Sequence, residues 1–460
     1  MSEHKEGKKK LHLSKVLGPM HVWALGVGVV LVGEFMGWNF TVAKGGTLGA
    51  IIACWVVGIL YLTISAISTE MGSVIPEAGG QYAMAKYLLG PLAAFNVGLM
   101  LVFEYVMLLA ADLLVVGELL NAFFPTLNTM PFMLFTLLIL SFLNYRGVLS
   151  TLTINLIITA IAFISIVVLV VYTVFFGSAD AAAQLATLSN GLSHGFLGII
   201  AALQFGMWFY LGIEGTAMSA EECRSTHRAL PLGSLIAMVS LLVGATLTWF
   251  VCSSLIPPDV LGSSVYPLFD AAKETGVPVL IALLLIGTVF SCLASSNGCI
   301  IDSSRALFSM SRDTLMPEFF SALHPKHKTP YRATLFLVPI AAVFAFTGML
   351  DHVITFSIIS ALYVYLYSAI MILRFRKMYP IGTIKRGYTV PAYKLLAAVI
   401  IAIVAATMFG MYLGYWIDIL AATLFYAICS VWFLKFRSGS IDTNKFFSAE
   451  NHDWPKPKKL

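Results

Sequence analysis

Long apolar runs constrain this chain more than any other feature of its sequence. A run of about 20 apolar residues is long enough to cross a lipid bilayer as a helix. Backbone polar groups find no water inside lipid, so such runs are expected to be helical. The sequence therefore predicts an all-α integral membrane protein with 12 transmembrane helices. The runs lie at 21–43, 47–68, 92–123, 131–144, 150–176, 195–219, 232–256, 278–301, 333–350, 354–373, 392–412 and 415–434.

The composition agrees with a membrane protein and excludes several other classes. The chain is 59% hydrophobic and 11% charged, whereas soluble proteins carry about 25% charged residues. Its six cysteines form no CxxC pair, so neither a disulfide framework nor a zinc site is expected. No polar segment is long enough to fold a core of its own. We therefore expect no soluble catalytic domain, no enzyme activity, no cofactor and no metal.

The basic residues are distributed unevenly between the predicted loops. If the N-terminus is cytoplasmic, 26 of the 28 Lys and Arg fall on the cytoplasmic side, and only Lys44 and Lys273 fall outside. This is the bias of the positive-inside rule. It predicts cytoplasmic tails at 1–20 and 435–460 and a multi-pass protein of the plasma (inner) membrane. The bias also explains the net charge of +5 without a nucleic-acid partner.

Acidic residues inside the predicted spans are the main functional signal. Glu34 lies in the first span, Glu104 and Asp112 in the third, and Glu214 in the sixth. Ionisable residues in a membrane are costly and usually mark a site or pathway. No Lys or Arg lies in the middle of any span, so each carboxyl is either protonated or visited by a cation. The pattern predicts transport of a cationic substrate. Metal-ion transport would give the same pattern, and a structural role for Glu104 is equally open.

The first and sixth spans share a local pattern. The stretch GEFMGWNF (33–40) and the stretch QFGMWFYLGIEGTAMS (204–219) each combine glycines, aromatic residues and one glutamate. Their glycines favour helix interruptions, although Gly33 and Gly37 also have the spacing of ordinary helix packing. Equivalent breaks five spans apart are typical of an inverted repeat. We expect repeats at 21–176 and 195–373, followed by two additional helices at 392–434.

Two further motifs resemble a known family. PEAGGQY (76–82) is similar to the P-x-A-G-G-x-Y signature of the amino acid/polyamine/organocation permeases, and residues 304–333 resemble the loop after their span eight. Residues 23–40 and 207–222 resemble the ethanolamine permease branch of that superfamily. The resemblance implies a proton-linked or exchanging carrier of a small amine. It also implies the five-plus-five inverted-repeat core of the sodium-coupled leucine transporters, with broken helices one and six.

The resemblance also bears on substrate recognition. Amino acid carriers of this group have a G-S-G-like break in span one, whose exposed N–H groups hold the substrate carboxylate. The corresponding place here reads Gly37-Trp38-Asn39, so two bulky side chains fill the nest. We infer that carboxylate recognition has been lost and that an amine without an acid group fits better.

Similarity to the superfamily's arginine/agmatine exchangers implies further site residues. Asp112 falls near a pocket-lining position, Trp208 at an aromatic that closes over substrate, and Glu214 at a span-six carboxylate. Both Trp38 and Trp208 offer faces for cation–π contact. The expected substrate-binding set is Glu34, Phe35, Gly37, Trp38, Asn39, Asp112, Trp208, Leu211, Glu214, Asn297 and Cys299.

The sequence departs from the family pattern in three places. The ethanolamine branch has a His-Gly pair in span eight where this chain has Asn297-Gly298, and Asp112 is not part of that branch's signature. Span five (153–165) lacks the basic residue that some proton-coupled members use. If protons drive transport, a carboxylate must carry them, and Glu34, Asp112 and Glu214 are the candidates.

Together these patterns predict a secondary active transporter that works by alternating access and imports a small organic amine. Ethanolamine is the leading candidate, with protons or a second amine as the coupled species. Choline or another methylated amine, a small diamine, and a general amino acid permease remain alternatives. The expected partners are the cationic substrate, protons and membrane lipid, and the protein is either a monomer or a homo-oligomer.

Overall fold

The computed structural model describes residues 15–146, 148–177 and 192–441, and every regular element within them is a helix. Eight of these helices are long and apolar enough to cross a membrane. They are α1 (Pro19–Met36), α2 (Trp38–Val74), α4 (Pro91–Phe123), α6 (Val148–Phe176), α10 (Ala229–Leu255), α13 (Pro278–Arg312), α15 (Leu350–Met378) and α16 (Tyr393–Trp432).

Shorter helices complete the chain. Three of them are apolar: α5 (Met130–Arg146), α8 (Gly195–Gly206) and α14 (Tyr331–Ala345). The others are α3 (Gln81–Leu88), η2 (Met207–Phe209), α9 (Gly215–Met218), η3 (Ala220–Glu222), α11 (Pro258–Leu261), α12 (Pro267–Glu274), η4 (Glu318–Ser321), η5 (Phe433–Arg437) and η6 (Ser438–Ser440).

Each predicted apolar run overlaps one or more helices, and the prediction of an all-helical membrane protein is confirmed. Helix α16 carries two runs, and α2 carries one run together with the end of the first. Helix α2 changes direction at Gly46 (φ 66°, ψ 177°), and α16 is kinked at Tyr415 (φ −132°, ψ 35°). The count of twelve crossings stays a prediction. Most of the two predicted tails lies outside the described residues.

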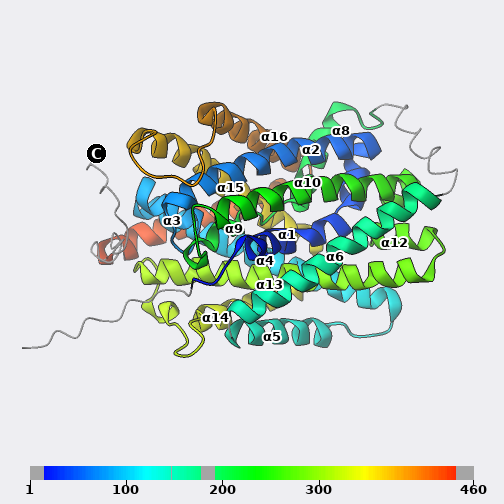
Figure 1. The fold of residues 1–460 in the computed structure, drawn as a ribbon, viewed down its shortest axis with the longest axis horizontal. Helices are drawn as coiled ribbons and strands as arrows, with labels where there is room; N and C mark the ends of the chain where they lie inside the picture. The colour runs from blue at the N-terminus through cyan, green and yellow to red at the C-terminus, as the bar shows by residue number, and fades with distance from the viewer. Residues whose placement is uncertain (1–14, 147, 178–191, 442–460) are drawn as a thin grey trace, which may run out of the picture.

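Helix α1 lies inside the bundle, and other helices shield it. The long helices run side by side (Figure 1), and α1 packs against α10, α13 and α6. As a result, every residue from Val22 to Met36 is buried. The first span is therefore a central element, so its polar residues face protein rather than lipid.

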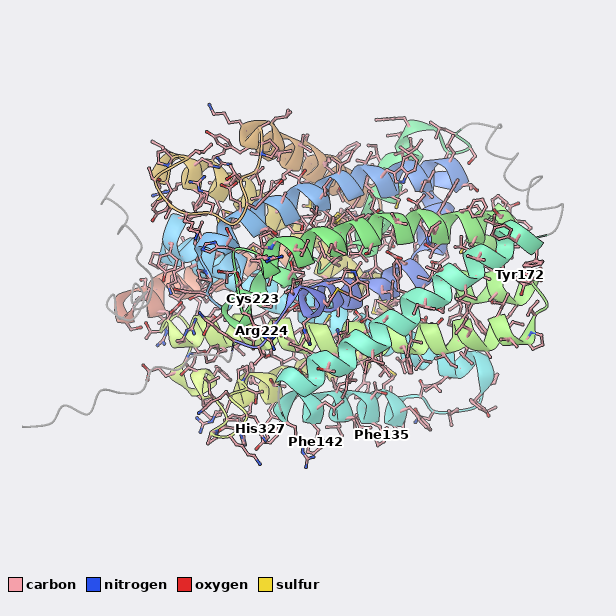
Figure 2. All side chains as sticks on the ribbon, viewed as in Figure 1. Phe135, Phe142, Tyr172, Cys223, Arg224 and His327 are labelled. Carbon is pink, nitrogen blue, oxygen red and sulfur yellow. The ribbon has the colours of Figure 1, made fainter. Side chains whose placement is uncertain are left out.

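The outer helices expose apolar side chains. Phe135 and Phe142 lie on α5 at the edge of the bundle (Figure 2), and their side chains are 62% and 53% exposed. Phe175, near the end of α6, is 74% exposed. An exposed apolar belt of this kind is expected where a protein meets hydrocarbon rather than water.

Candidate functional site

The first predicted interruption is a bend at Gly37, between α1 and α2. Gly37 keeps nearly helical angles (φ −84°, ψ −9°), and its N–H donates to the carbonyl of Gly33 at 2.7 Å. The Gly37 carbonyl accepts a hydrogen bond from the hydroxyl of Thr41 at 2.8 Å. The Gly37 N–H is therefore already engaged within the chain and is not free to hold a carboxylate.

The second interruption, in the sixth predicted span, is much larger. Helix α8 ends at Gly206, and after one 3₁₀ turn the chain stays irregular until α9 begins at Gly215. Gly212 has φ 104°, a conformation that glycine adopts far more readily than other residues. The predicted site residues Trp208, Leu211 and Glu214 all lie on this interrupted segment and are buried.

Glycines bring α1 into direct contact with the interrupted segment. A Cβ atom on Gly33 would lie 2.1 Å from the carbonyl oxygen of Trp208 and 2.7 Å from its carbonyl carbon. A Cβ on Gly298 of α13 would lie 2.1 Å from the Cγ2 atom of Val29. At Gly33 the two backbones are thus closer than a side chain would permit, and at Gly298 the Val29 side chain fills the space that a Cβ would need.

Glu34 points from α1 toward α10. A Cβ atom on Gly244 would lie 2.5 Å from its Oε2 atom, so this glycine makes room for the carboxyl. Near it lie Cys54 and Tyr210, whose Sγ and hydroxyl oxygen are 3.1 Å apart. Neither carboxyl oxygen of Glu34 has a hydrogen-bond partner among the described residues. Glu34 is therefore a buried acid that only a proton or a cation would neutralise.

The aromatic residues next to Glu34 form part of a packed wall. The indole N–H of Trp38 donates to the hydroxyl of Thr248 at 2.9 Å, and its ring stacks on Phe209 with centroids 4.2 Å apart. Phe35 is buried against α13. The Oδ1 atom of Asn39 is buried and has no hydrogen-bond partner in the described part of the chain. Of these three side chains, only that of Asn39 keeps a free polar atom.

Four fully buried carboxyls lie along α4, α13 and the interrupted segment. We call this group the acidic seam: Glu104, Asp112, Glu214 and Asp302. The Tyr365 hydroxyl donates to Oε1 of Glu214 at 2.6 Å, and the Glu104 carboxyl lies beside that of Glu214. The seam therefore concentrates negative charge, or the protons that neutralise it, at the centre of the bundle.

Asp112 and Cys299 extend the acidic seam along α4 and α13. The Ser296 hydroxyl is 3.5 Å from Oδ2 of Asp112, and the Oδ1 atom of that residue has no partner in the described ranges. Cys299 lies near Glu104, Asp112 and Asp302. Cys299 thus links Asp112 to the carboxyls that neighbour Glu214, whereas Glu34 and Trp38 face α10.

The sequence analysis missed Asp302. The eighth predicted run stops at residue 301, but α13 continues to Arg312. Asp302 is three residues after Cys299, so the two share one face of the helix. A Cβ atom on Gly215 would lie 2.1 Å from Oδ2 of Asp302, which places this carboxyl against the start of α9. The helical spacing from Cys299 is the signal that would have found it.

Asn297 belongs to a separate polar network. Its Oδ1 accepts a hydrogen bond from Asn144 at 2.8 Å, and its Nδ2 donates to Asn155 at 3.3 Å. Asn155 in turn donates to the carbonyl of Ala24 at 3.2 Å. The amide of Asn297 therefore joins α13 to α5 and, through Asn155, to α6 and α1. In this conformation both of its polar atoms bond to these asparagines and not to the acidic seam.

Buried ion pairs close one end of the bundle. We call them the ionic layer: Glu77, Lys86, Glu221, Glu222, Arg305, Arg312 and Asp313. Arg305 pairs with Glu222 and also lies 3.5 Å from Oδ1 of Asp302, which links this layer to the acidic seam. The N-terminal segment lies at the same end, where the N–H of Leu17 donates to the carbonyl of Glu222 at 2.9 Å.

The motif PEAGGQY ties α2 and α3 to this layer. The Ala78 N–H donates to Oε2 of Glu221 at 2.9 Å, and its carbonyl accepts from Ser309 at 2.7 Å. Gly79 and Gly80 have φ of 99° and 51°, which favour glycine. A Cβ on Gly80 would also lie 3.1 Å from the backbone nitrogen of Met218, at the end of α9. The motif thus docks against the end of the interrupted segment.

Lys86 offers a test of the ionic layer. Its Nζ lies 3.0 Å from Glu77 and 2.8 Å from Asp313. Burial alone would raise the pKa of Glu77, but Lys86 and Arg312 hold this pKa below its usual value. A carboxyl with a lowered folded-state pKa contributes stability above its unfolded pKa and loses it as the pH falls through the folded value.

We therefore expect Lys86→Gln to lower the free energy of unfolding by about 3 kcal/mol at pH 7, because it leaves buried carboxylates without their cation. The loss should shrink as the pH falls toward about 5, since protonation then neutralises Glu77 in the variant. Thermal unfolding of the detergent-purified protein at both pH values measures the effect, with the exposed Lys377→Gln as control. Equal losses at both pH values would contradict a charge-based role.

Comparison with known proteins agrees with this architecture. The amino acid permease family model matches residues 20–452. An uncharacterized transporter of Rhizobium meliloti (strain 1021) is 49% identical over 453 residues, which cover 97% of each chain.

More distant relatives have named substrates. The branched-chain amino acid permease BcaP of Bacillus subtilis (strain 168) is 23% identical over 383 residues, 80% of this chain and 82% of that protein. A methylthioribose transporter of the same organism is 25% identical over 444 residues, 92% of this chain and 95% of that protein. The family match includes both interrupted segments, the acidic seam and the ionic layer, and it establishes this chain as a multi-pass membrane transporter that belongs to the amino acid permease family.

Proposed function

We propose that this protein is a secondary active transporter that imports a small organic amine, with ethanolamine as the leading candidate. The observation that carries the proposal is the set of buried carboxyls at Glu34, Glu104 and Asp112, which form no ion pair with any described residue. Burying an unpaired charge is costly, and an ammonium group or a proton removes that cost. A small amine would supply the missing cation without a second charged group.

The bend at Gly37 supports an amine over an amino acid. An amino acid carrier needs free N–H groups for the substrate carboxylate, but the Gly37 N–H is bonded to Gly33, and Trp38 is fixed by Thr248 and Phe209. The negative field of Glu34 and the acidic seam would also repel a carboxylate, and such repulsion is an effective means of discrimination.

Alternating access would use the two interrupted segments and the ionic layer. In the proposed mechanism, repeats at 21–176 and 195–373 form the five-plus-five core of a protein with twelve crossings. The ionic layer would lie at the cytoplasmic end, beside a cytoplasmic N-terminus, in the plasma membrane. Opening toward the cytoplasm would separate Arg305 from Glu222 and so connect the acidic seam to water. Protons would be carried by Glu34, Asp112 or Glu214.

Two alternative cargoes have specific support. The branched-chain amino acid permease BcaP favours a branched-chain or other amino acid as the cargo, whereas the methylthioribose transporter indicates that relatives also carry other solutes. A methylated amine such as choline would suit the aromatic surroundings through cation–π contact, since the buried ring of Trp208 lies 6.3 Å from that of Phe40.

Uptake by proteoliposomes tests the proposal. With an acidic exterior, we expect labelled ethanolamine to accumulate, choline to enter more slowly, and alanine and glutamine to remain at background. Dissipating the proton gradient should abolish accumulation if protons are coupled. Uptake of amino acids without uptake of amines would instead support the amino acid permease, for which Glu34→Gln should have little effect.

A further inference from the structure

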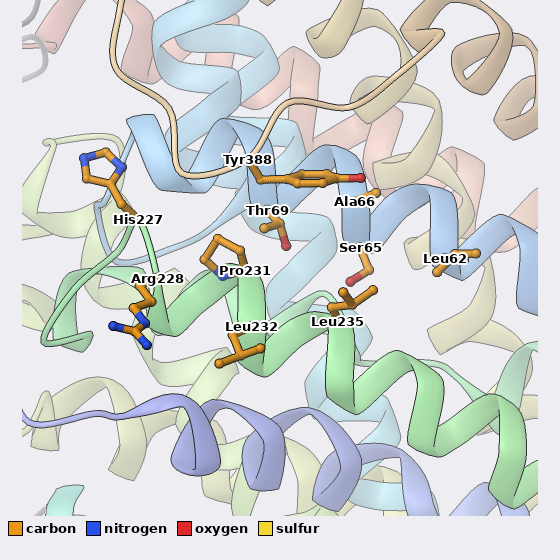
Figure 3. A pocket seen from close by; sticks show the side chains of 10 residues that line it. All are labelled: Leu62, Ser65, Ala66, Thr69, His227, Arg228, Pro231, Leu232, Leu235 and Tyr388. Carbon is orange, nitrogen blue, oxygen red and sulfur yellow. The ribbon is translucent and has the colours of Figure 1, made fainter.

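A groove with mainly apolar walls runs between α2 and α10. At one end is a cavity of about 440 Å³, which Figure 3 shows between the two helices and under Tyr388. Its walls are mainly apolar, with Leu62 and Ala66 from α2 and Leu232 and Leu235 from α10. Leu235 is 55% exposed, so this cavity opens to the surroundings of the bundle.

A second cavity continues the groove. It has a volume of about 390 Å³ and shares Leu62 with the first. Gly58 and Leu242 line its middle, and Trp55 lies at the far end, where the indole N–H donates to Thr246 at 3.1 Å. The two cavities therefore form one groove with an apolar floor and a defined end at Trp55.

The groove is long enough to hold an acyl chain that crosses one leaflet of a bilayer. Thr69 and Trp55 are fourteen residues apart on α2, which corresponds to about 21 Å of helix. Half of a bilayer's hydrocarbon core is about 15 Å thick. An acyl chain would therefore fit along the groove, with its head group at the Thr69 end.

The charges at that end select the head group. Arg228 and His227 line the first cavity and are exposed. The guanidinium of Arg228 makes no hydrogen bond or ion pair with any residue that the structure describes. Arg228 also precedes the first turn of α10, so the positive end of that helix dipole faces the same region. A phosphate group would meet positive charge at this end of the groove. An acyl chain along the rest of the groove would contact mainly apolar side chains.

We propose that this groove binds one anionic phospholipid, with its phosphate at Arg228 and His227 and an acyl chain along Leu62 toward Trp55. The site is independent of the transported substrate. Because α2 and α10 belong to different predicted repeats, the bound lipid would bridge them. On these two helices, Gly58 lies next to Tyr210, and Gly244 lies next to Glu34.

Thermal unfolding of the full-length, delipidated protein in detergent tests this site. Phosphatidylglycerol should raise the unfolding temperature in a saturable manner, phosphatidylethanolamine with the same chains should do so only weakly, and inorganic phosphate should not. Arg228→Gln should weaken the apparent affinity for phosphatidylglycerol about fivefold, as expected for one cation near a lipid surface. The matched control is Arg374→Gln, an exposed arginine at the end of α15 that does not line the groove.

A second variant tests the acyl-chain part. Leu235→Trp would fill the groove from its exposed side, and should abolish the phosphatidylglycerol effect while leaving the unliganded unfolding temperature near that of the wild type. Equal stabilisation by both lipids would overturn head-group selection. Stabilisation by phosphate alone would indicate an anion site without a lipid. Equal losses in Arg228→Gln and Arg374→Gln would mean that lipid binding is not localised to this groove.

Discussion

Asp112→Asn is expected to weaken amine binding about 100-fold and to leave the unfolding temperature almost unchanged. Removing one partner of a buried charge pair costs several kcal/mol, and about 2.7 kcal/mol corresponds to 100-fold. The substitution keeps the shape of the side chain, and the hydrogen bond that the carboxyl accepts from Ser296 is long, at 3.5 Å. The half-saturation concentration for ethanolamine uptake measures the loss, and thermal unfolding of the same preparation measures folding.

The matched control for this variant is Glu118→Gln. Glu118 lies on the same helix, α4, but is only partly buried and lies near the end of the helix. The Glu118→Gln variant should therefore change the affinity for ethanolamine less than twofold, because a partly solvated carboxylate contributes little to the binding of a charged substrate. Unchanged affinity in Asp112→Asn would show that this residue has a structural role.

Gly33→Ala is expected to abolish transport and to lower the free energy of unfolding by about 3 kcal/mol, as overpacking of a tight core does. The new methyl group would lie 2.1 Å from a backbone oxygen of Trp208, and no rotation of a side chain relieves a clash with backbone. Helix α1 and the interrupted segment would have to separate. Protein yield, thermal unfolding and ethanolamine uptake together measure the effect.

Gly49→Ala provides the comparison. Gly49 is a buried glycine of α2, and a Cβ there would meet Ile199 at an ordinary 3.5 Å. Alanine favours helix by up to about 1 kcal/mol over glycine, so this variant should be neutral or slightly stabilised. If the two variants unfold at the same temperature, the close approach at Gly33 does not stabilise the site.

The helices and the presence of a polar centre were predictable from the sequence because both are local properties. Apolar runs specify spans, and an acid such as Glu34 or Glu214 stands out in such a run wherever its side chain points. The interruption near Gly212 was also predictable, since glycines flanking a carboxylate in a span are a local signal as well.

The direction of each side chain was not predictable, because it depends on which helices meet. Glu34 faces α10 through the gap left by Gly244, whereas Asp112 faces α13, and these contacts join residues far apart in the chain. Asn297 is bonded to Asn144 and Asn155 for the same reason. Asp302 lay just beyond a predicted run, since an apolar pattern does not reveal how far a helix continues after its last apolar residues.

The most direct test of the central claim is a competition measurement on wild-type proteoliposomes. Uptake of labelled ethanolamine is measured with and without a hundredfold excess of unlabelled ethanolamine, choline, alanine or glutamine. If the buried carboxyls bind an ammonium group and the bend at Gly37 excludes a carboxylate, unlabelled ethanolamine abolishes uptake and the two amino acids leave it unchanged. Inhibition by alanine or glutamine as strong as that by ethanolamine would contradict the claim.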